Sequence, residues 1–94
     1  MKTVNAVHVS PLDNCVTLTD SAEPGDAVSF LEDGAEKAVT ARVNIPMWHK
    51  MAAKPIEKGG GVYKYGAIIG VALEDIEPGD HVHIHNMRSP KNGG

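Results

Sequence analysis

Apolar and polar residues alternate along most of this chain in short runs, and glycine or proline separates the runs. Such alternation places successive side chains on opposite faces and is typical of half-buried β-strands. No window of a dozen residues free of Gly and Pro shows the 3.6-residue period of a helix. The pattern predicts strands at about residues 3–9, 15–19, 27–31, 37–44, 49–53, 61–65, 68–73 and 81–85.

A short turn element occurs three times, at residues 22–28, 56–62 and 76–82. Each copy has an apolar residue, a glutamate, a turn that contains glycine, and a strand that leads to a valine. Glycine accepts a positive φ at such a turn, so the chemistry fits a tight reversal. Short one-turn helices before each glycine are also expected. These features predict a small, mostly-β domain, as a compact barrel-like or folded-ribbon arrangement rather than a flat sandwich.

The length of 94 residues suits one small domain with a modest core. Aromatic residues make up only 4% of the chain, so Val, Ile, Leu and Ala must build that core. We assign residues 1–88 to the domain. Residues 89–94, with the sequence Ser-Pro-Lys-Asn-Gly-Gly, are predicted to form a flexible C-terminal tail.

The formal net charge of −3 argues against nucleic acid or an anionic membrane as the main partner. No segment approaches the roughly 18 consecutive apolar residues of a membrane span. Cys15 is the single cysteine, so no internal disulfide can form, and we expect a cytoplasmic protein. Cys15 itself is predicted to be a small core or surface residue rather than a nucleophile.

Three of the five histidines lie at positions 81, 83 and 85. In a strand these side chains share one face, while Val82 and Ile84 are buried on the other. Imidazole titrates near neutral pH and is a common metal ligand. Three such residues span about 13 Å, so they cannot all bind one ion. A third ligand must come from elsewhere, with His49 as the obvious candidate; the alternative is a solvent-facing strand without a ligand.

His49-Lys50 places a cation beside an imidazole, a pair that suits a ligand with a carboxylate. The alternative is an exposed pair without a role. The residues just before and after it, Met47, Trp48 and Met51, form an apolar group that is expected in the core or, as the second choice, at a protein interface.

Five segments of the second half occur in a fixed order: His49-Lys50, residues 62–66 (Val-Tyr-Lys-Tyr-Gly), residues 69–72 (Ile-Gly-Val-Ala), Asp75-Ile76 with Gly79, and residues 82–86 (Val-His-Ile-His-Asn). This series resembles the small SAF-type domain of the altronate and galactarate dehydratase family. That domain also occurs as a separate small subunit, as in the two-chain sulfolactate sulfo-lyase. The resemblance implies a β-clip fold.

The resemblance also implies the small subunit of a two-chain sugar-acid or hydroxy-acid dehydratase, or of a related lyase. Relatives remove water or sulfite from a hydroxy acid. A divalent metal, iron in several members, is expected to be held mainly by a large subunit. The chain alone is not expected to be active, and it is left open whether it forms a homo-oligomer.

The family resemblance implies roles for individual residues. Substrate or metal contacts are expected from three groups: the catalytic His49 and Lys50, the substrate-binding Lys64, Tyr65 and Asn86, and the metal-contacting His83 and His85. His81 carries less weight, because the first position of the histidine row varies among relatives. Two departures from the family are Trp48, where relatives usually have Gly, and Pro55, where they commonly have Asp.

Two other functions remain open at this point. The first is a stand-alone module that binds a sugar acid or a metal without catalysis. The second is a purely structural interaction domain.

Overall fold

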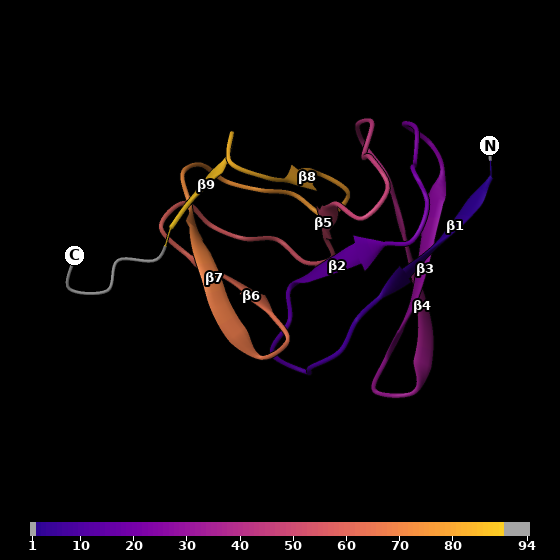
Figure 1. The fold of residues 1–94 in the computed structure, drawn as a ribbon, viewed down its shortest axis with the longest axis horizontal. Helices are drawn as coiled ribbons and strands as arrows, with labels where there is room; N and C mark the ends of the chain where they lie inside the picture. Colours follow the sequence, from indigo (N-terminus) through magenta and orange to yellow (C-terminus); the bar gives the residue numbers. More distant parts are fainter. Residues whose placement is uncertain (1, 90–94) are drawn as a thin grey trace.

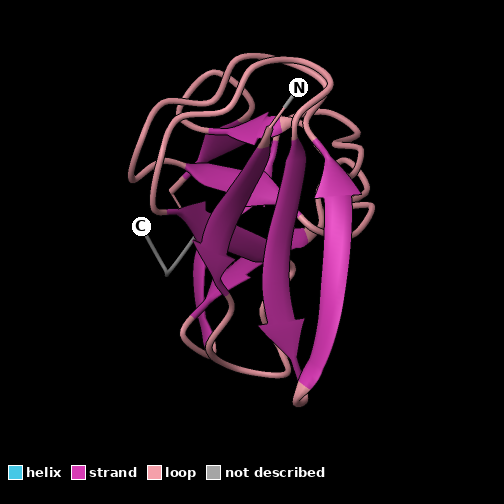
Figure 2. Cartoon of the chain, turned by 90° about the vertical axis from the view of Figure 1, so that its right-hand side faces the viewer, coloured by secondary structure: helices cyan, strands magenta, loops and turns pink. Residues whose placement is uncertain are grey.

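The computed structural model describes residues 2–89, which form nine strands joined by turns (Figure 1). The strands are β1 (Thr3–Val7), β2 (Cys15–Leu18), β3 (Ala27–Glu32), β4 (Ala35–Thr40), β5 (Lys50–Ala52), β6 (Gly61–Lys64), β7 (Ala67–Ala72), β8 (His81–Val82) and β9 (Met87–Arg88). Within residues 2–89 there is no helix, and hence none that could cross a membrane (Figure 2). The fold is mostly β, as predicted.

Two sheets make up the molecule. The larger has the order β4-β3-β1-β2-β5-β8, and the smaller has the order β6-β7-β9. β1 and β3 are parallel, and the other strand pairs are antiparallel. In Figure 1 the β6–β7 hairpin and the β3–β4 hairpin lie on opposite sides, with β2 and β5 between them.

The core consists of two clusters, and β2 and β5 contribute to both. Met51 packs into the cluster that includes β1 and β3, whereas its neighbour Ala52 packs into the cluster that includes β6 and β7. Successive residues of a strand point to opposite faces, so β5 forms part of a wall between the two clusters. The His49-Lys50 pair therefore lies where the chain enters this wall.

The last predicted strand is wrong in part. The predicted strands up to residue 73 correspond to β1–β7 with shifted ends, but β8 ends at Val82 and residues 83–86 form a turn. Ile84, which a strand would bury, is 78% exposed at this turn. The reason is Asn86, whose side-chain amide donates to the carbonyl of His81 and accepts from the N–H of His83. These bonds replace ladder bonds and turn the chain.

The predicted one-turn helices are wrong as well. Within each of the three repeated segments one backbone bond closes the turn, from Asp26 N–H to the Glu23 carbonyl in the first copy and at the matching positions of the others. The third residue of each turn is a glycine of positive φ: Gly25 at 96°, Gly59 at 85° and Gly79 at 95°. A left-handed residue cannot extend a right-handed helix, so the chain leaves into the next strand.

A fourth copy of this turn covers residues 45–50. The N–H of His49 donates to the carbonyl of Pro46, and the left-handed position is held by Trp48, at φ 68°. A bulky residue with positive φ is a genuine outlier. The four turns also pair with one another through bridges between Ala22 and Ile45 and between Ile56 and Ile76.

All four turns are locked to the core by the same two backbone bonds. The left-handed residue donates its N–H to the carbonyl of a buried residue, and that residue donates its own N–H to the next carbonyl of the turn. The buried partners are Ala41 for Gly25, Leu18 for Trp48, Ala72 for Gly59 and Ala52 for Gly79. Because four turns share this geometry, Trp48 has the backbone of a glycine position.

The positive φ of Trp48 predicts that glycine and alanine have opposite orders of stability at residue 48 and at residue 47. Trp48→Gly and Trp48→Ala both remove the indole, but only glycine is free of strain at positive φ. We expect the glycine variant to be more stable by about 1 kcal/mol. At Met47, where φ is not positive, alanine should be the more stable of the two. Urea unfolding of the four variants measures both differences, and a Trp48→Ala chain as stable as Trp48→Gly would contradict the prediction.

Candidate metal centre

Three histidines come together at one end of the wall. His49 precedes β5, His81 begins β8, and His83 follows β8. β5 and β8 are antiparallel with Lys50 opposite Val82, so continuing this register places His49 opposite His83. The rings of His49 and His83 are 4.8 Å apart between centroids, and those of His81 and His83 are stacked at 5.3 Å. We call His49, His81 and His83 the histidine trio.

Because residue 46 is a proline, the side chain of His49 is not needed to hydrogen-bond its own turn. At the matching position of two other turns, Asp26 and Asp80 use a carboxylate oxygen to accept the N–H of Glu23 and Glu77. Proline has no N–H, so no carboxylate is needed where His49 stands. The imidazole is thereby released from the turn and reaches the ring of His81.

The other two members of the trio are held by Asn86. This residue is buried, and its amide bonds to His81 and His83 are 2.8 and 3.0 Å long. Its backbone carbonyl also accepts the N–H of Leu73, which ties the turn to the end of β7. The side chain of Asn86 therefore positions the histidines, and both ends of its amide are occupied by the chain itself.

The ring nitrogens of the trio could hold one metal ion. One nitrogen from each ring lies within 4.8 Å of the others, and His49 Nδ1 and His81 Nε2 share a hydrogen bond of 2.9 Å. Two imidazole nitrogens bound to one ion at about 2.0–2.1 Å are themselves about 3 Å apart. The pair is thus close to the separation that a shared ion requires, and a ring nitrogen of His83 lies within 4.8 Å of both.

The electrostatics favour a neutral imidazole at His81. Burial is the largest cause that lowers the pKa of His81 from 6.5 to about 4, and the charges of His49, His85, His83 and Lys50 act in the same direction. A neutral imidazole keeps the lone pair that a cation needs. At neutral pH His81 is therefore ready to bind a metal ion rather than a proton.

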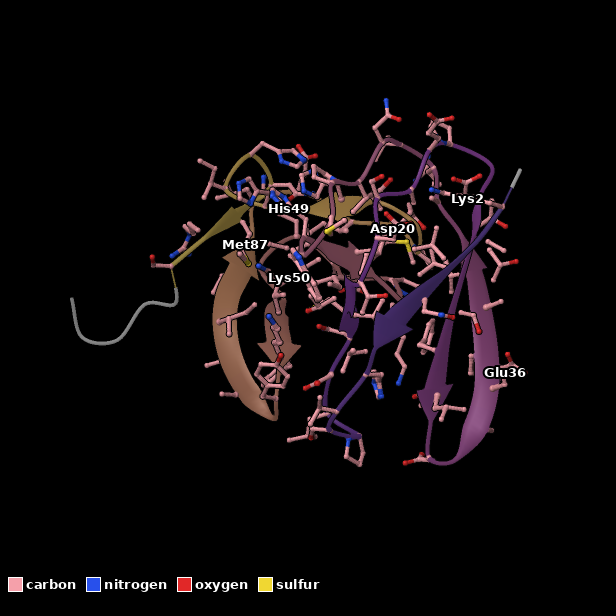
Figure 3. The ribbon with its side chains drawn as sticks, turned by 45° about the vertical axis from the view of Figure 1, so that its right-hand side comes forward. Lys2, Asp20, Glu36, His49, Lys50 and Met87 are labelled. Atoms are coloured by element: carbon pink, nitrogen blue, oxygen red, sulfur yellow. The ribbon has the colours of Figure 1, made fainter. Side chains whose placement is uncertain are left out.

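Lys50 lies directly after His49, at the start of β5, and lies below it in Figure 3. The positive charge of Lys50 acts to lower the pKa of His81 and that of the buried Cys15. Burial raises the pKa of Cys15 to about 11, although Lys50 and Lys64 act in the opposite direction. Cys15 therefore stays a thiol at neutral pH and belongs to the core, which is one of the two places that the sequence leaves open for it.

Two of the predicted site residues lie elsewhere. Lys64 and Tyr65 are at the tip of the β6–β7 hairpin, at the end of the molecule opposite to β8 (Figure 1). The amine of Lys64 lies 4.8 Å from the centre of the Tyr65 ring, and the backbone N–H of Tyr65 donates to the buried carboxylate of Asp13. The structure does not bring this pair to the histidines, and its role in substrate binding stays a prediction.

His85 lies beside the trio without belonging to it. Its ring is 5.4 Å from that of His81, and the one group of three metal-ligating side chains found in residues 2–89 contains His49, His81 and His83. The sequence reasoning anticipated that His49 and the late histidines converge, but it gave too little weight to His81. The three apolar residues next to the His49-Lys50 pair have different environments: Met51 is in the core, whereas Met47 and Trp48 are exposed.

The fourth turn was missed in the sequence because Trp48 stands where the other copies have glycine. A usable signal was present, since Ile45 precedes β5 at the same distance as Ile76 precedes β8.

The buried carboxylate of Asp13 was missed in the sequence too. Burial alone would raise its pKa, but backbone N–H groups of Gly66, Ser10 and Tyr65 outweigh this and keep the pKa below 3.8.

Comparisons with known proteins agree with the resemblance. Residues 4–90 match the sequence model of the altronate/galactarate dehydratase SAF domain. Altronate dehydratase of Escherichia coli (strain K12) is 44% identical over 84 residues, which are 88% of this chain and 16% of that protein. The (2R)-sulfolactate sulfo-lyase subunit alpha of Paracoccus pantotrophus is 39% identical over 59 residues, which are 63% of this chain and 88% of that subunit. The chain thus spans a small part of the first relative and most of the second.

The lowered pKa of His81 predicts how stability changes with pH. Between about pH 4 and pH 6.5 the unfolded chain binds a proton at residue 81 that the folded chain does not. The free energy of unfolding therefore rises with pH across this window. The pKa values of Asp13 and Asp26 are lowered from 3.8, so their contributions are lost only at more acidic pH. Thermal unfolding of the metal-free chain should show a lower midpoint at pH 5 than at pH 7.

The matched variant is His81→Gln, which removes the titrating group and keeps a polar side chain. Its midpoint should change less between pH 7 and pH 5 than that of the natural chain. An equal change in both chains would show that residue 81 is not the source of the pH dependence.

Proposed function

The chain belongs to the altronate/galactarate dehydratase SAF domain family, and we propose that it is the small subunit of a two-chain hydroxy-acid dehydratase or related lyase. In this proposal a separate large subunit carries most of the catalytic machinery. The small subunit adds the histidine trio and Lys50 to the mouth of the active site.

The lengths of the relatives support the division into two chains. Altronate dehydratase contains the matching segment as 16% of a longer chain, whereas the sulfo-lyase subunit alpha consists almost entirely of it, at 88%. The same small domain is therefore found both inside a long lyase and as a subunit of its own. The proposal takes the second case for this chain.

The resemblance implies a divalent metal, expected to be iron and held mainly by the large subunit, and the donor set of the trio fits a share in binding it. His49, His81 and His83 would hold it through one ring nitrogen each. When bound, the ion acts as a Lewis acid toward oxygen atoms of the substrate. Three neutral imidazoles bring no negative charge, so they preserve the attraction of the centre for a carboxylate.

Lys50 gives the chain a second way to bind an acid. It follows His49 directly, and its ammonium group offers three donors and a full positive charge. We assign it the carboxylate of the hydroxy acid. Asn86 contributes by holding His81 and His83 in place. Because Lys64 and Tyr65 lie at the far end, the substrate contacts in this proposal come from Lys50 and the trio.

The single, buried Cys15 fits a reducing compartment, and we place the complex in the cytoplasm.

A second candidate function has one observation in its favour: the trio is complete within this chain. A module that binds a metal or a sugar acid without catalysis needs nothing more.

Reconstitution tests the proposed function. The chain and a large polypeptide of the altronate dehydratase type from the same genome are purified separately and then mixed with Fe²⁺. Altronate, galactarate and (2R)-sulfolactate are offered, and formation of a 2-oxo acid or release of sulfite is measured. We expect activity on a hydroxy acid with the mixture and none with either chain alone.

Variants assign the roles in the reconstituted enzyme. His49→Gln should lower kcat by about 10–100-fold, because it removes one ligand. Lys50→Met should raise KM by about tenfold, because a charge-assisted bond to the carboxylate is lost. His8→Gln is the control, since His8 lies against Phe30, outside the trio. Binding of an acid to the isolated chain at micromolar concentration, with no turnover by the mixture, would favour the module instead.

A further inference from the structure

Pro46 is the first residue of one of the four repeated turns. In each turn the N–H of the fourth residue donates to the carbonyl of the first. The first residues, in chain order, are Glu23, Pro46, Glu57 and Glu77, and the fourth residues are Asp26, His49, Gly60 and Asp80. Glutamate has a backbone N–H and proline has none. The turn at Pro46 therefore keeps its carbonyl bond but lacks the N–H that the other three turns have.

The side chain of the fourth residue closes two of these turns a second time. A carboxylate oxygen of Asp26 accepts the N–H of Glu23 at 2.9 Å, and one of Asp80 accepts the N–H of Glu77 at 2.9 Å. Short polar side chains commonly make such bonds to a nearby backbone N–H. The turn that ends at His49 has a side-chain acceptor too, but its first residue has no N–H to offer.

His49 carries an acceptor at the same place in its side chain as these carboxylates. Nδ1 of an imidazole is bonded to Cγ, as the carboxylate oxygens of aspartate are, so in the same turn it would face an N–H of residue 46. In the structure Nδ1 instead shares the 2.9 Å hydrogen bond with Nε2 of His81. A ring nitrogen has one lone pair, which can accept an N–H or bind a metal ion but not both. A backbone N–H at residue 46 would therefore compete with the histidine trio for His49.

We propose that Pro46 is a positioning residue of the metal centre: by removing one backbone donor, it keeps Nδ1 of His49 for the histidine trio. The inference rests on the proposed function, in which the trio takes a share in binding the metal. Pro46 acts through His49 and supplies no ligand atom from its own side chain. The first residue of the turn thus determines whether the fourth closes the turn or serves the metal centre.

The place of the proline within the turn is decisive, because proline also occurs in two other copies. Pro24 and Pro78 are the second residues of their turns and leave the N–H of the first residue in place. The turn with Pro78 leads into His81, as the turn with Pro46 leads into His49. Pro78→Ala is therefore the matched control: it removes a proline from an equivalent turn without adding an N–H at the first position.

Amide exchange of the metal-free chain, followed by NMR, tests for the competing hydrogen bond. Pro46→Ala adds an N–H at residue 46, and Pro46→Gln adds it with a neutral relative of the glutamate that the other turns have. We expect this amide to exchange about fivefold or more slowly in both variants than in the same variants combined with His49→Ala. Equal exchange with and without the imidazole would overturn the inference.

Titration of the isolated chains with Co²⁺, followed by absorption, tests the consequence for metal binding. Pro78→Ala should bind as the natural chain does, whereas Pro46→Ala and Pro46→Gln should bind about fivefold or more weakly. Equal affinity of the natural chain and both Pro46 variants, or an equal loss in Pro78→Ala, would overturn the role of Pro46 and leave the proposed function intact. Absence of Co²⁺ binding by the natural chain would overturn the share of the trio in metal binding, and the role of Pro46 with it.

Discussion

The structure depends on the left-handed residue of four turns and on the two backbone bonds that lock each turn to a buried neighbour. These bonds satisfy polar groups that would otherwise be buried without partners, which is a strict requirement in a small core. They also set the direction in which each following strand leaves. β3, β5, β6 and β8 all begin just after such a turn, so the turns determine where His49 and His81 enter the sheet. The site is a product of the turns as much as of the strands.

Most of the strands could be predicted from the sequence, because alternation and glycine placement report backbone geometry directly. The convergence of His49 with the late histidines could also be anticipated, on the chemical ground that a row of three needs a ligand from elsewhere. The expected strand over residues 81–85 was nevertheless wrong beyond Val82. His83 reaches His49 through a turn that Asn86 closes, and Ile84 is exposed. The two hydrogen bonds of the Asn86 side chain override the strand that the alternation of residues 81–85 predicts. Such a local bond between side chain and backbone leaves no trace in a hydrophobic pattern. The fourth turn was hidden for a related reason, since Trp48 gives no sign that it adopts a glycine conformation.

The features of the trio fit a shared active site better than a self-contained one. The histidines are only partly buried, and they carry no acidic ligand among them. A neutral, partly open centre keeps the charge of a bound cation for an anionic substrate and leaves room for further ligands. The matching segment is a small part of the long relative and most of the short one.

The central claim is that the turns bring His49, His81 and His83 to one metal ion. X-ray absorption at the cobalt edge of the Co²⁺-loaded chain measures the ligands most directly. We expect three imidazole nitrogens at about 2.0–2.2 Å in the natural chain and in His85→Ala, with two in His83→Ala. A first shell of water oxygens alone in the natural chain, or a loss of imidazole in His85→Ala equal to that in His83→Ala, would contradict the account.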